Sequence, residues 1–210
     1  MQTKAVFLDA LGTTVEVEPP WIQLASELEV EVDEGLVAAV RKEMAYYRAH
    51  AHEGTDEGAL AELRLRCAEL LATELGRPVS VEQMMASIRF RAYPDAPPAL
   101  ARLRHRGLTL VCVSNWDISL SEVLERCGLG GAFDGVVSSA ISGHRKPDPA
   151  IFGAALRLAG CSPAEALHVG DSPEEDGAAA HAAGIRCLLI DRDGGGEIAS
   201  LGEIEQHLER

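Results

Sequence analysis

The sequence predicts an α/β fold, a doubly wound parallel sheet with an inserted all-helical unit, and three observations lead to this prediction. Short apolar runs alternate with helical patterns over much of the 210-residue chain. The apolar runs lack strict alternation of apolar and polar residues, which is typical of parallel strands buried on both faces. One long block, from about Pro19 to Arg91, shows helical patterns and no strand-like run.

Five apolar runs are the expected strands. The first is AVFLD at residues 5–9, and four more follow Arg91: LTLVCVSN, GVVSS, ALHVGD and IRCLLID, at residues 108–115, 135–139, 166–171 and 185–191. Helical patterns lie between these runs, at residues 97–106, 119–127, 149–159 and 174–183, and several end at a glycine that is typical of a helix C-terminus. This alternation predicts a sheet with helices on both faces.

The helical block interrupts the sheet after its first strand. A helical insertion of this kind is placed to cover the carboxyl ends of the strands, so we expect two units. Residues 1–15 and 94–210 would form the α/β core, and residues 16–93 an all-helical cap. A glycine-rich turn at 54–58 and a proline-rich exit at 93–98 fit this division.

The charge of the chain limits its partners. A formal net charge of −14 argues against nucleic acid or an anionic membrane as the main partner. It remains compatible with a small anionic substrate, because a nearby cation or metal dominates the field at short range. The sequence gives no preference between a monomer and a homodimer.

Localisation signals are absent from the sequence pattern. No apolar stretch approaches the roughly 20 residues that span a bilayer, and the first apolar run is too short for a secretory signal. The five cysteines are scattered and form no CxxC pair, which is typical of a reducing compartment. We therefore expect a cytoplasmic protein without a membrane partner.

Polar residues stand where the expected strands end. Asp9 ends the first strand, Ser114 and Asn115 the second, and Asp171 the fourth, while Lys146 follows the third strand in RKPDP. In open α/β sheets, ligands bind outside the carboxyl ends of the strands, so these side chains are expected to converge there.

The segment GDSPEED also has a purely structural interpretation. Ser172 as N-cap, Pro173 at the first helical position and Glu175 at the third predict a complete capping box. This explains the serine and the glutamates without any function. It leaves Asp171 and Asp176 as the acids that need another explanation.

Four segments, in order along the chain, resemble the motifs of the haloacid dehalogenase-like (HAD) hydrolase superfamily. They are FLDALGTT, VSN, RKPDP and GDSPEED. The resemblance covers essentially the whole chain and is to the branch with a helical cap inserted after the first motif. It implies a Rossmann-like core and a hydrolase.

The resemblance also implies a role for each residue. Asp9 would be the nucleophile that forms a covalent intermediate. Ser114 would hold substrate oxygens, and Lys146 would neutralise charge between nucleophile and substrate. A Mg²⁺ ion would be held by three carboxylates and one backbone carbonyl, those of Asp9, Asp171, Asp176 and Leu11.

Further residues are expected to contact the substrate. Thr13 lies in the loop after the nucleophile, Asn115 can help Ser114, and Trp116 falls near the mouth of the pocket. Arg41 follows Asp9 by about thirty residues. This position is similar to that of an arginine that contacts the carboxylate and halide in 2-haloacid dehalogenases.

Leu11 is the departure from the pattern, because phosphatases of this superfamily carry an Asp there that protonates the leaving group. Such acid–base help accelerates a reaction roughly 10²- to 10⁴-fold. The 2-haloacid dehalogenases lack this acid, since halide leaves without a proton. The phosphonoacetaldehyde hydrolases also lack it and use a cap lysine, for which Lys42 is a candidate.

Phosphate chemistry is favoured over these alternatives, because GDSPEED keeps metal-binding acids that a dehalogenase does not need. The expected function is Mg²⁺-dependent hydrolysis of a small phosphorylated metabolite, weakened or specialised by Leu11. The alternatives are hydrolysis of a carbon–halogen bond and a non-catalytic module that binds metal or phosphate.

Overall fold

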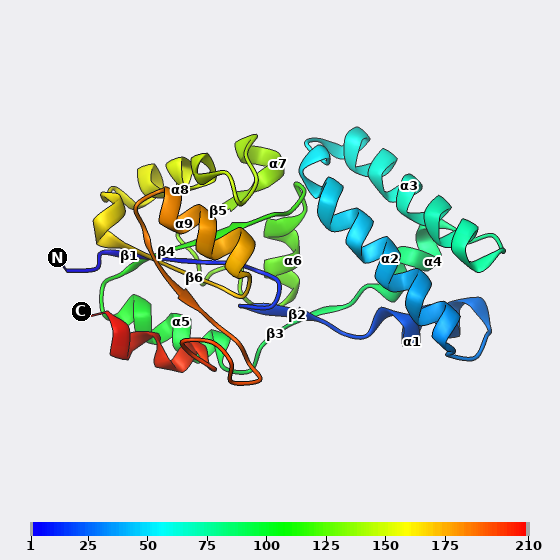
Figure 1. Cartoon of the computed structure of the whole chain (residues 1–210), viewed down its shortest axis with the longest axis horizontal. Coiled ribbons are helices and arrows are strands. Elements are labelled where there is room, and N and C mark those ends of the chain that lie inside the picture. The colour runs from blue at the N-terminus through cyan, green and yellow to red at the C-terminus, as the bar shows by residue number, and fades with distance from the viewer. Residues whose placement is uncertain (1, 209–210) are drawn as a thin grey trace.

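A five-stranded parallel sheet forms the centre of one lobe of the computed structural model, which describes residues 2–208 (Figure 1). The strand order is β5-β4-β1-β6-β7, so the first strand lies in the middle. The predicted parallel α/β sheet is confirmed. Its strands are β1 (Ala5–Leu8), β4 (Thr109–Ser114), β5 (Gly135–Ser138), β6 (Ala166–Gly170) and β7 (Arg186–Leu189).

Helices cover both faces of this sheet. Val6 and Leu8 of β1 pack into one apolar cluster, and the alternate residues Ala5 and Phe7 pack into another, as the two-residue period of a strand requires. The first cluster is closed by α5 (Ala96–His105), α6 (Leu120–Arg126) and η5 (Leu201–His207). The second is closed by η2 (Pro149–Ile151), α8 (Phe152–Ala159) and α9 (Ala178–Ala182).

Residues 20–87 form a separate helical unit with its own apolar core, which includes Leu24, Leu63 and Leu71. Several of its helices show clear side-chain caps: Asp33 accepts a hydrogen bond from the Leu36 amide at 2.7 Å, and Ser80 forms a complete capping box. The elements are α1 (Pro20–Leu28), α2 (Glu34–His50), η1 (Ala51–Glu53), α3 (Glu57–Leu75) and α4 (Val81–Ser87).

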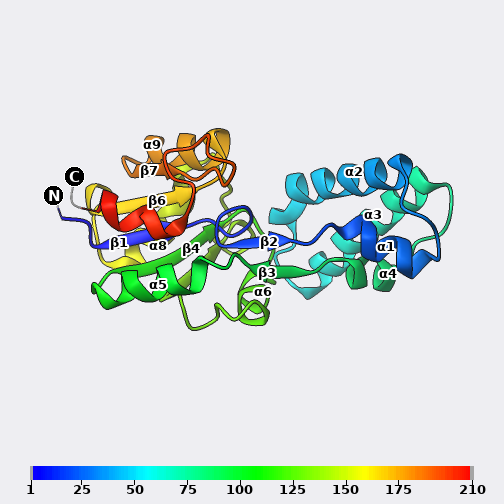
Figure 2. The same ribbon diagram turned by 90° about the horizontal axis from the view of Figure 1, so that it is seen from below.

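A two-stranded antiparallel ribbon joins the helical unit to the sheet lobe (Figure 2). It pairs β2 (Val15–Val17) with β3 (Phe90–Ala92). The expectation of helices alone between Pro19 and Arg91 is therefore wrong at its end. These strands have only three residues each, and Glu16 pairs with Arg91 in their middle, so they lack the apolar pattern by which a strand is predicted.

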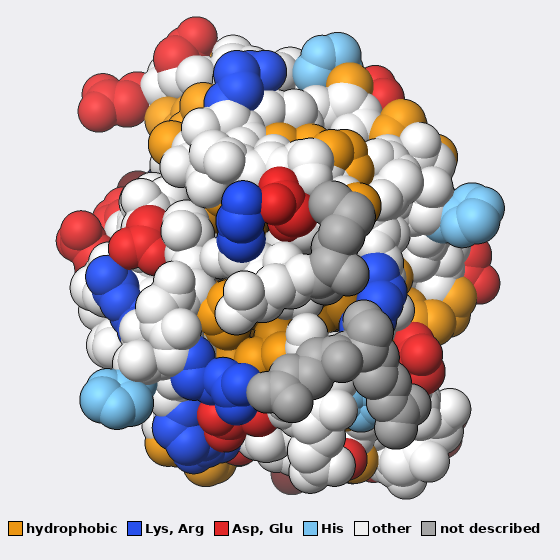
Figure 3. Space-filling model, turned by 90° about the vertical axis from the view of Figure 1, so that its left-hand side faces the viewer, with side chains coloured by type: hydrophobic (Ala, Val, Ile, Leu, Met, Phe, Trp, Pro, Cys, Tyr) orange, Lys and Arg blue, Asp and Glu red, His pale blue; other side chains and the backbone are white. Residues whose placement is uncertain are grey.

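The start of β1 and the end of η5 lie at the end of the sheet lobe that faces away from the helical unit (Figure 1). On that face acidic and basic side chains are interspersed (Figure 3). Within residues 2–208, no helix combines the length and the apolar character needed to cross a bilayer.

Candidate active site

The first strand ends directly at Asp9, and a tight turn holds the aspartate in place. The Thr14 hydroxyl donates to the Asp9 carbonyl oxygen at 3.0 Å. Gly12 has φ of +83°, and a Cβ at this position would overlap the carboxylate of Asp171. Glycine is therefore needed here both for the left-handed backbone and for the close approach of the first and fourth motifs.

Lys146 lies at the centre of the site and is 1% exposed. Its Nζ donates to Oδ1 of Asp9 at 2.6 Å, to Oδ1 of Asp176 at 2.5 Å and to the Val113 carbonyl at 3.1 Å. All three ammonium donors are thus used, as a fully buried lysine requires. The structure places this lysine between Asp9 of the first motif and Asp176 of the fourth.

Asp176 comes from η4 (Pro173–Gly177), a single π turn that follows β6, and is 1% exposed. Its Oδ2 accepts from the Ser172 amide at 3.2 Å, and Nε2 of His168 lies 2.7 Å from its Oδ1. A Cβ on Gly170 would overlap this carboxylate, so glycine at the end of β6 lets Asp176 approach the strand.

Three carboxylates converge at this edge of the sheet. Asp9, Asp171 and Asp176 each offer one oxygen, and these oxygens all lie within 4.8 Å of one another. Asp171 is the exposed member, and the other two are buried. When all three are ionised, the single charge of Lys146 leaves two negative charges without compensation.

The pKa values of the three carboxyl groups respond to burial and to this excess of negative charge. Burial raises the pKa of Asp9, against the opposing pull of the Lys146 ammonium. Partial desolvation of its carboxyl group, together with the charges of Asp9 and Asp176, raises the pKa of Asp171 to about 7, although the residue as a whole is exposed. Burial also disfavours ionised Asp176, but Lys146 and His168 hold the pKa of this carboxyl well below its usual range.

This donor set fits a hard divalent cation. Carboxylate oxygens are the ligands that Mg²⁺ prefers, and two uncompensated negative charges match its charge. The raised pKa of Asp171 reflects desolvation first and then repulsion from Asp9 and Asp176, and a cation would remove this repulsion. Asp9, Asp171 and Asp176 are the side chains that would hold the ion.

Glu175 does not act as predicted. Ser172 accepts a hydrogen bond from the Glu175 amide at 3.1 Å, so the N-cap is confirmed. The Glu175 carboxylate, however, accepts from Asn115 Nδ2 at 3.0 Å and from Arg145 Nη2 at 3.1 Å instead of closing the capping box. Those two donors hold the carboxylate toward the loop that carries Lys146.

Asn115 fixes the backbone of the lysine loop. Its Oδ1 accepts from the Lys146 amide at 2.7 Å, and its Nδ2 donates to the Lys146 carbonyl at 2.9 Å as well as to Glu175. All of these contacts are within the protein. The geometry therefore gives Asn115 a role in positioning Lys146, beside the expected contact with substrate.

A cavity of about 740 Å³ lies between the two lobes, above the carboxylates. Ser114, Asn115 and Trp116 line it from the end of β4, and Leu11 lines it from the turn after Asp9. The Trp116 ring packs against that of Phe90 in the ribbon, with centroids 5.2 Å apart. The structure thus brings Leu11, Ser114, Asn115 and Trp116, all named from the sequence, to the wall of one cavity.

Two predicted substrate contacts are placed elsewhere. Arg41 is exposed and lies over the Trp21 ring, 5.6 Å from its centroid, and it does not line the cavity. Thr13 is fully buried, its hydroxyl has no hydrogen-bond partner among residues 2–208, and it is not part of the cavity wall. The number of residues between Asp9 and Arg41 therefore did not show on which face of α2 the Arg41 side chain lies.

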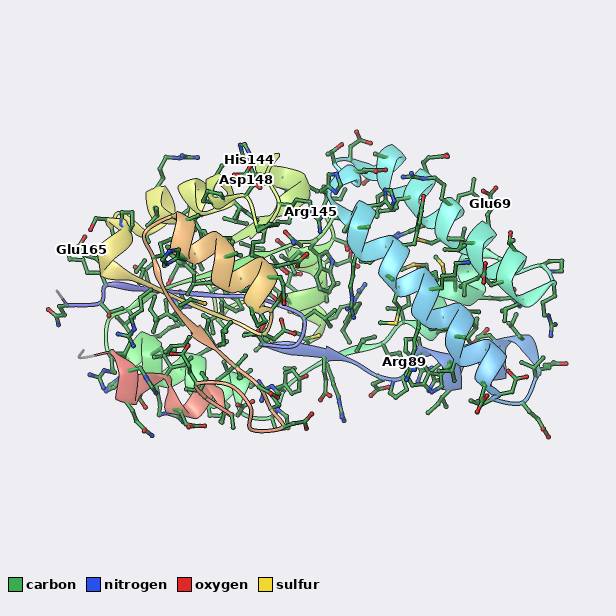
Figure 4. The ribbon with its side chains drawn as sticks, in the orientation of Figure 1. Glu69, Arg89, His144, Arg145, Asp148 and Glu165 are labelled. Carbon is green, nitrogen blue, oxygen red and sulfur yellow. The ribbon has the colours of Figure 1, made fainter. Side chains whose placement is uncertain are left out.

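Lys42, a candidate from the sequence, does not line the cavity, and neither does His144, which lies two residues before Lys146. The Lys42 ammonium donates to Glu74 at 2.6 Å on the outer surface of the helical unit. His144 pairs with Asp148 at 2.9 Å, and both lie on the outer side of the sheet lobe (Figure 4).

The cavity wall also contains residues that sequence reasoning missed. Glu43 and Tyr47 line it from one face of α2, four residues apart. The Tyr47 hydroxyl donates to Oδ2 of Asp117 at 2.8 Å, and the Ile118 amide donates to the Gly54 carbonyl at 3.1 Å, so the two lobes touch directly. The four-residue spacing was the available signal, but it does not show which face turns inward.

Two curated relatives resemble part of the chain. Haloacid dehalogenase-like hydrolase domain-containing protein 3 of Bos taurus is 44% identical over 95 residues, which are 45% of this chain and 38% of that protein. Phosphoserine phosphatase of Thermus thermophilus is 41% identical over 105 residues, which are 50% of this chain and 42% of that protein. The match thus spans about two fifths of the length of these relatives.

Solved structures match the whole chain. A HAD phosphatase from Thermococcus onnurineus has a TM-score of 0.69 at 24% identity, covering 99% of this chain and 98% of that one. A dehalogenase with an intermediate complex has a TM-score of 0.77 at 21% identity, covering 100% and 98%. These likenesses show that phosphatases and dehalogenases share this fold.

A family model described as haloacid dehalogenase-like hydrolase matches residues 3–184, most of the chain and all four motifs. The matched range includes the sheet edge with Asp9, Lys146 and Asp176 and the whole helical unit. The chain belongs to the haloacid dehalogenase-like hydrolase family.

Proposed function

We propose that this protein is a Mg²⁺-dependent hydrolase of a small phosphorylated metabolite, with Asp9 as its covalent nucleophile. The observation that carries the proposal is the third carboxylate. Asp171 stands beside Asp9 and Asp176 at a position where a metal-free enzyme would gain only repulsion. The similarity to a phosphoserine phosphatase supports the same chemistry.

The reaction takes two steps at phosphorus. A carboxylate oxygen of Asp9 attacks phosphorus, and the bond to the leaving oxygen breaks, so the leaving group departs with the bonding electrons. Water then attacks the phosphorus of the aspartyl phosphate and releases inorganic phosphate, a proton and the Asp9 carboxylate. Covalent catalysis of this kind divides one difficult displacement into two easier ones.

Lys146 and Ser114 are the other two groups assigned to chemistry. The Lys146 ammonium, 2.6 Å from Asp9, opposes the effect of burial on the Asp9 pKa and lowers the repulsion between the nucleophile and an anionic substrate. The Ser114 hydroxyl at the end of β4 donates to the phosphoryl oxygens. The carboxylates of Asp9, Asp171 and Asp176 and the Leu11 carbonyl would hold a Mg²⁺ ion, which would supply positive charge to offset that of the phosphoryl group.

Leu11 determines which leaving groups are cleaved well. Its side chain lines the cavity beside the nucleophile and cannot donate a proton. An alkoxide leaving group therefore departs without acid help, at a cost of roughly 10²- to 10⁴-fold in rate. We infer that acyl and aryl phosphates, whose leaving groups are stable anions, are better substrates than alkyl phosphates.

The helical unit acts as the cap in this proposal. Residues 16–93 cover the cavity, and residues 1–15 with 94–210 form the catalytic core. All five cysteines are free thiols, which supports a reducing compartment such as the cytoplasm. Small phosphorylated metabolites are the partners we infer, for a monomer or a homodimer.

A 2-haloacid dehalogenase is the second candidate, and Leu11 is the observation that favours it. Halide leaves without a proton, so an apolar side chain beside the nucleophile is no disadvantage there. The cluster with Asp171 has no function in that reaction. A non-catalytic binding module, the third candidate, would have no use for Asp9 as a nucleophile.

A paired assay separates these candidates. One arm measures phosphate release from p-nitrophenyl phosphate and the other halide release from 2-chloropropionate, each with and without Mg²⁺ and each with Asp9→Asn as control. We expect Mg²⁺-dependent phosphate release that Asp9→Asn abolishes. Metal-independent halide release would establish the dehalogenase instead, and equal behaviour of wild type and variant in both arms would leave only the binding module.

A further inference from the structure

Glu43 is a buried carboxyl group in the wall of the cavity. It lies in the middle of α2, is 5% exposed, and lines the cavity together with apolar neighbours such as Val40, Met44 and Leu71. Glutamate is almost never buried to this degree unless it is paired. An ionised carboxylate in such surroundings is strongly destabilised without a partner of opposite charge.

The part of the chain that the structure describes supplies no such partner. Among residues 2–208, no lysine, arginine or histidine forms an ion pair with Glu43, although Arg48, Arg64 and Arg126 line the same cavity. The neighbouring group is the Cys67 thiol, a weak hydrogen-bond donor. Burial accordingly raises the pKa of Glu43. Asp9 and Asp176 differ from Glu43 in this respect, because both of these buried carboxylates form an ion pair with Lys146.

We propose that Glu43 selects the substrate by binding its ammonium group, so that the preferred substrates are small phosphate esters that carry a primary amine. The inference rests on the proposed function, which places the phosphate at the strand ends. In a cavity with both groups in its wall, the phosphate end meets Asp9 and Ser114 while the cationic end meets Glu43. The substrate then provides the positive charge that the protein leaves out.

An ammonium group fits this site better than a hydroxyl. A hydroxyl satisfies one hydrogen bond but leaves the carboxylate charge uncompensated in apolar surroundings. An ammonium donates hydrogen bonds and neutralises the charge, and charge-assisted hydrogen bonds are roughly twice as strong as neutral ones. The apolar residues around Glu43 exclude water and so strengthen this pairing.

Calorimetry with non-hydrolysable ligands tests the inference. The wild-type protein with Mg²⁺ is titrated with 3-aminopropylphosphonate and with butylphosphonate, which differ only in an ammonium or a methyl group at the far end. Aminoalkylphosphonates one carbon shorter and longer, each with its alkyl counterpart, cover the unknown separation of the two ends. Glu43→Gln removes the charge and keeps the shape, and Glu122→Gln, an exposed acid of the same cavity wall, is the matched control.

We expect wild type and Glu122→Gln to bind the amine of at least one pair roughly tenfold to a hundredfold more tightly than its alkyl partner, as one charge-assisted hydrogen bond provides. Glu43→Gln should lose this preference while it binds the alkyl phosphonate as before and melts no earlier than wild type. Equal binding within every pair would overturn the role of Glu43 and leave the phosphate site intact. Failure of all phosphonates to bind would overturn the proposed function and this inference together.

Discussion

The two walls of the cavity differ in charge and in origin. The strand-end wall carries Asp9, Asp171 and Asp176 around the buried Lys146, and its members come from loops that follow β1 and β6 and from the loop after α7 (Ser139–Ser142). The helical wall combines many apolar side chains with the polar side chains of Glu43, Tyr47, Arg48 and Arg64. Its apolar members include Leu24, Val40, Met44, Leu71, Met84 and Met85.

This difference suggests a division of roles, in which the strand-end wall carries out the reaction and the helical wall distinguishes one substrate from another. Changes in the strand-end wall should alter the rate with every substrate, because they act on the reacting atoms or on the charge around them. Changes in the helical wall should alter how substrates are distinguished, because this wall faces the part of the substrate that does not react. The following predictions test that division.

Asp9→Asn is expected to have the largest effect. An amide is not a nucleophile toward phosphorus, and loss of a covalent nucleophile costs about 10⁴-fold or more in kcat. Steady-state hydrolysis of p-nitrophenyl phosphate measures it, with circular dichroism to show that the variant is folded. Residual activity within tenfold of wild type would remove Asp9 from its role.

Leu11→Asp should raise the rate with alkyl phosphates. A carboxyl group at this position can protonate the leaving alkoxide, which is worth roughly 10²- to 10⁴-fold at most. The gain with an aryl phosphate should be much smaller, since that leaving group needs no proton. Comparison of the two kcat values in one variant checks this, and an equal gain with both substrates would speak against acid catalysis.

Lys146→Met should destabilise the protein by about 3–5 kcal/mol, because it leaves Asp9 and Asp176 buried without their shared cation. Added Mg²⁺ should restore part of this loss. Urea unfolding with and without Mg²⁺ measures both effects. Lys4→Met, which breaks an exposed pair with Glu165, is the matched control and should change the stability little.

Tyr47→Phe should have the smallest effect and act through the helical wall. It removes the hydrogen bond to Asp117 that joins the two lobes and leaves a 2% exposed carboxylate with one donor fewer. Loss of such a bond costs about 1–3 kcal/mol. KM should rise several-fold while kcat stays within about twofold, whereas an equal fall in kcat would show that the residue affects chemistry.

The strand-end wall was largely predictable from the sequence. Parallel strands buried on both faces give continuous apolar runs, and the residue after each run is fixed in position by the strand itself. Asp9, Ser114 and Asp171 follow in this way. Lys146 was predicted from its motif. Its burial between the carboxylates of Asp9 and Asp176 was not predicted, because it depends on how the folded chain brings distant segments together.

The helical wall was not predictable to the same extent. A helical pattern shows that residues repeat on a face, but the packing of α1 to α4 decides which face turns toward the cavity. Arg41 was therefore expected inside and lies outside, while Glu43, two residues further along, faces the cavity. The polar partners of Glu175 were missed for a similar reason, since they lie 30 and 60 residues away.

Mg²⁺ binding measured by calorimetry at pH 8 and pH 6 tests the central claim most directly. Because the pKa of Asp171 is raised to about 7, this carboxyl is ionised at pH 8 and mostly protonated at pH 6 without metal. We predict one Mg²⁺ ion per chain, weaker binding at pH 6 with release of a proton, and loss of binding in Asp171→Asn. Wild type and Asp171→Asn with the same affinity, or with none at either pH, would contradict a metal centre at this edge of the sheet.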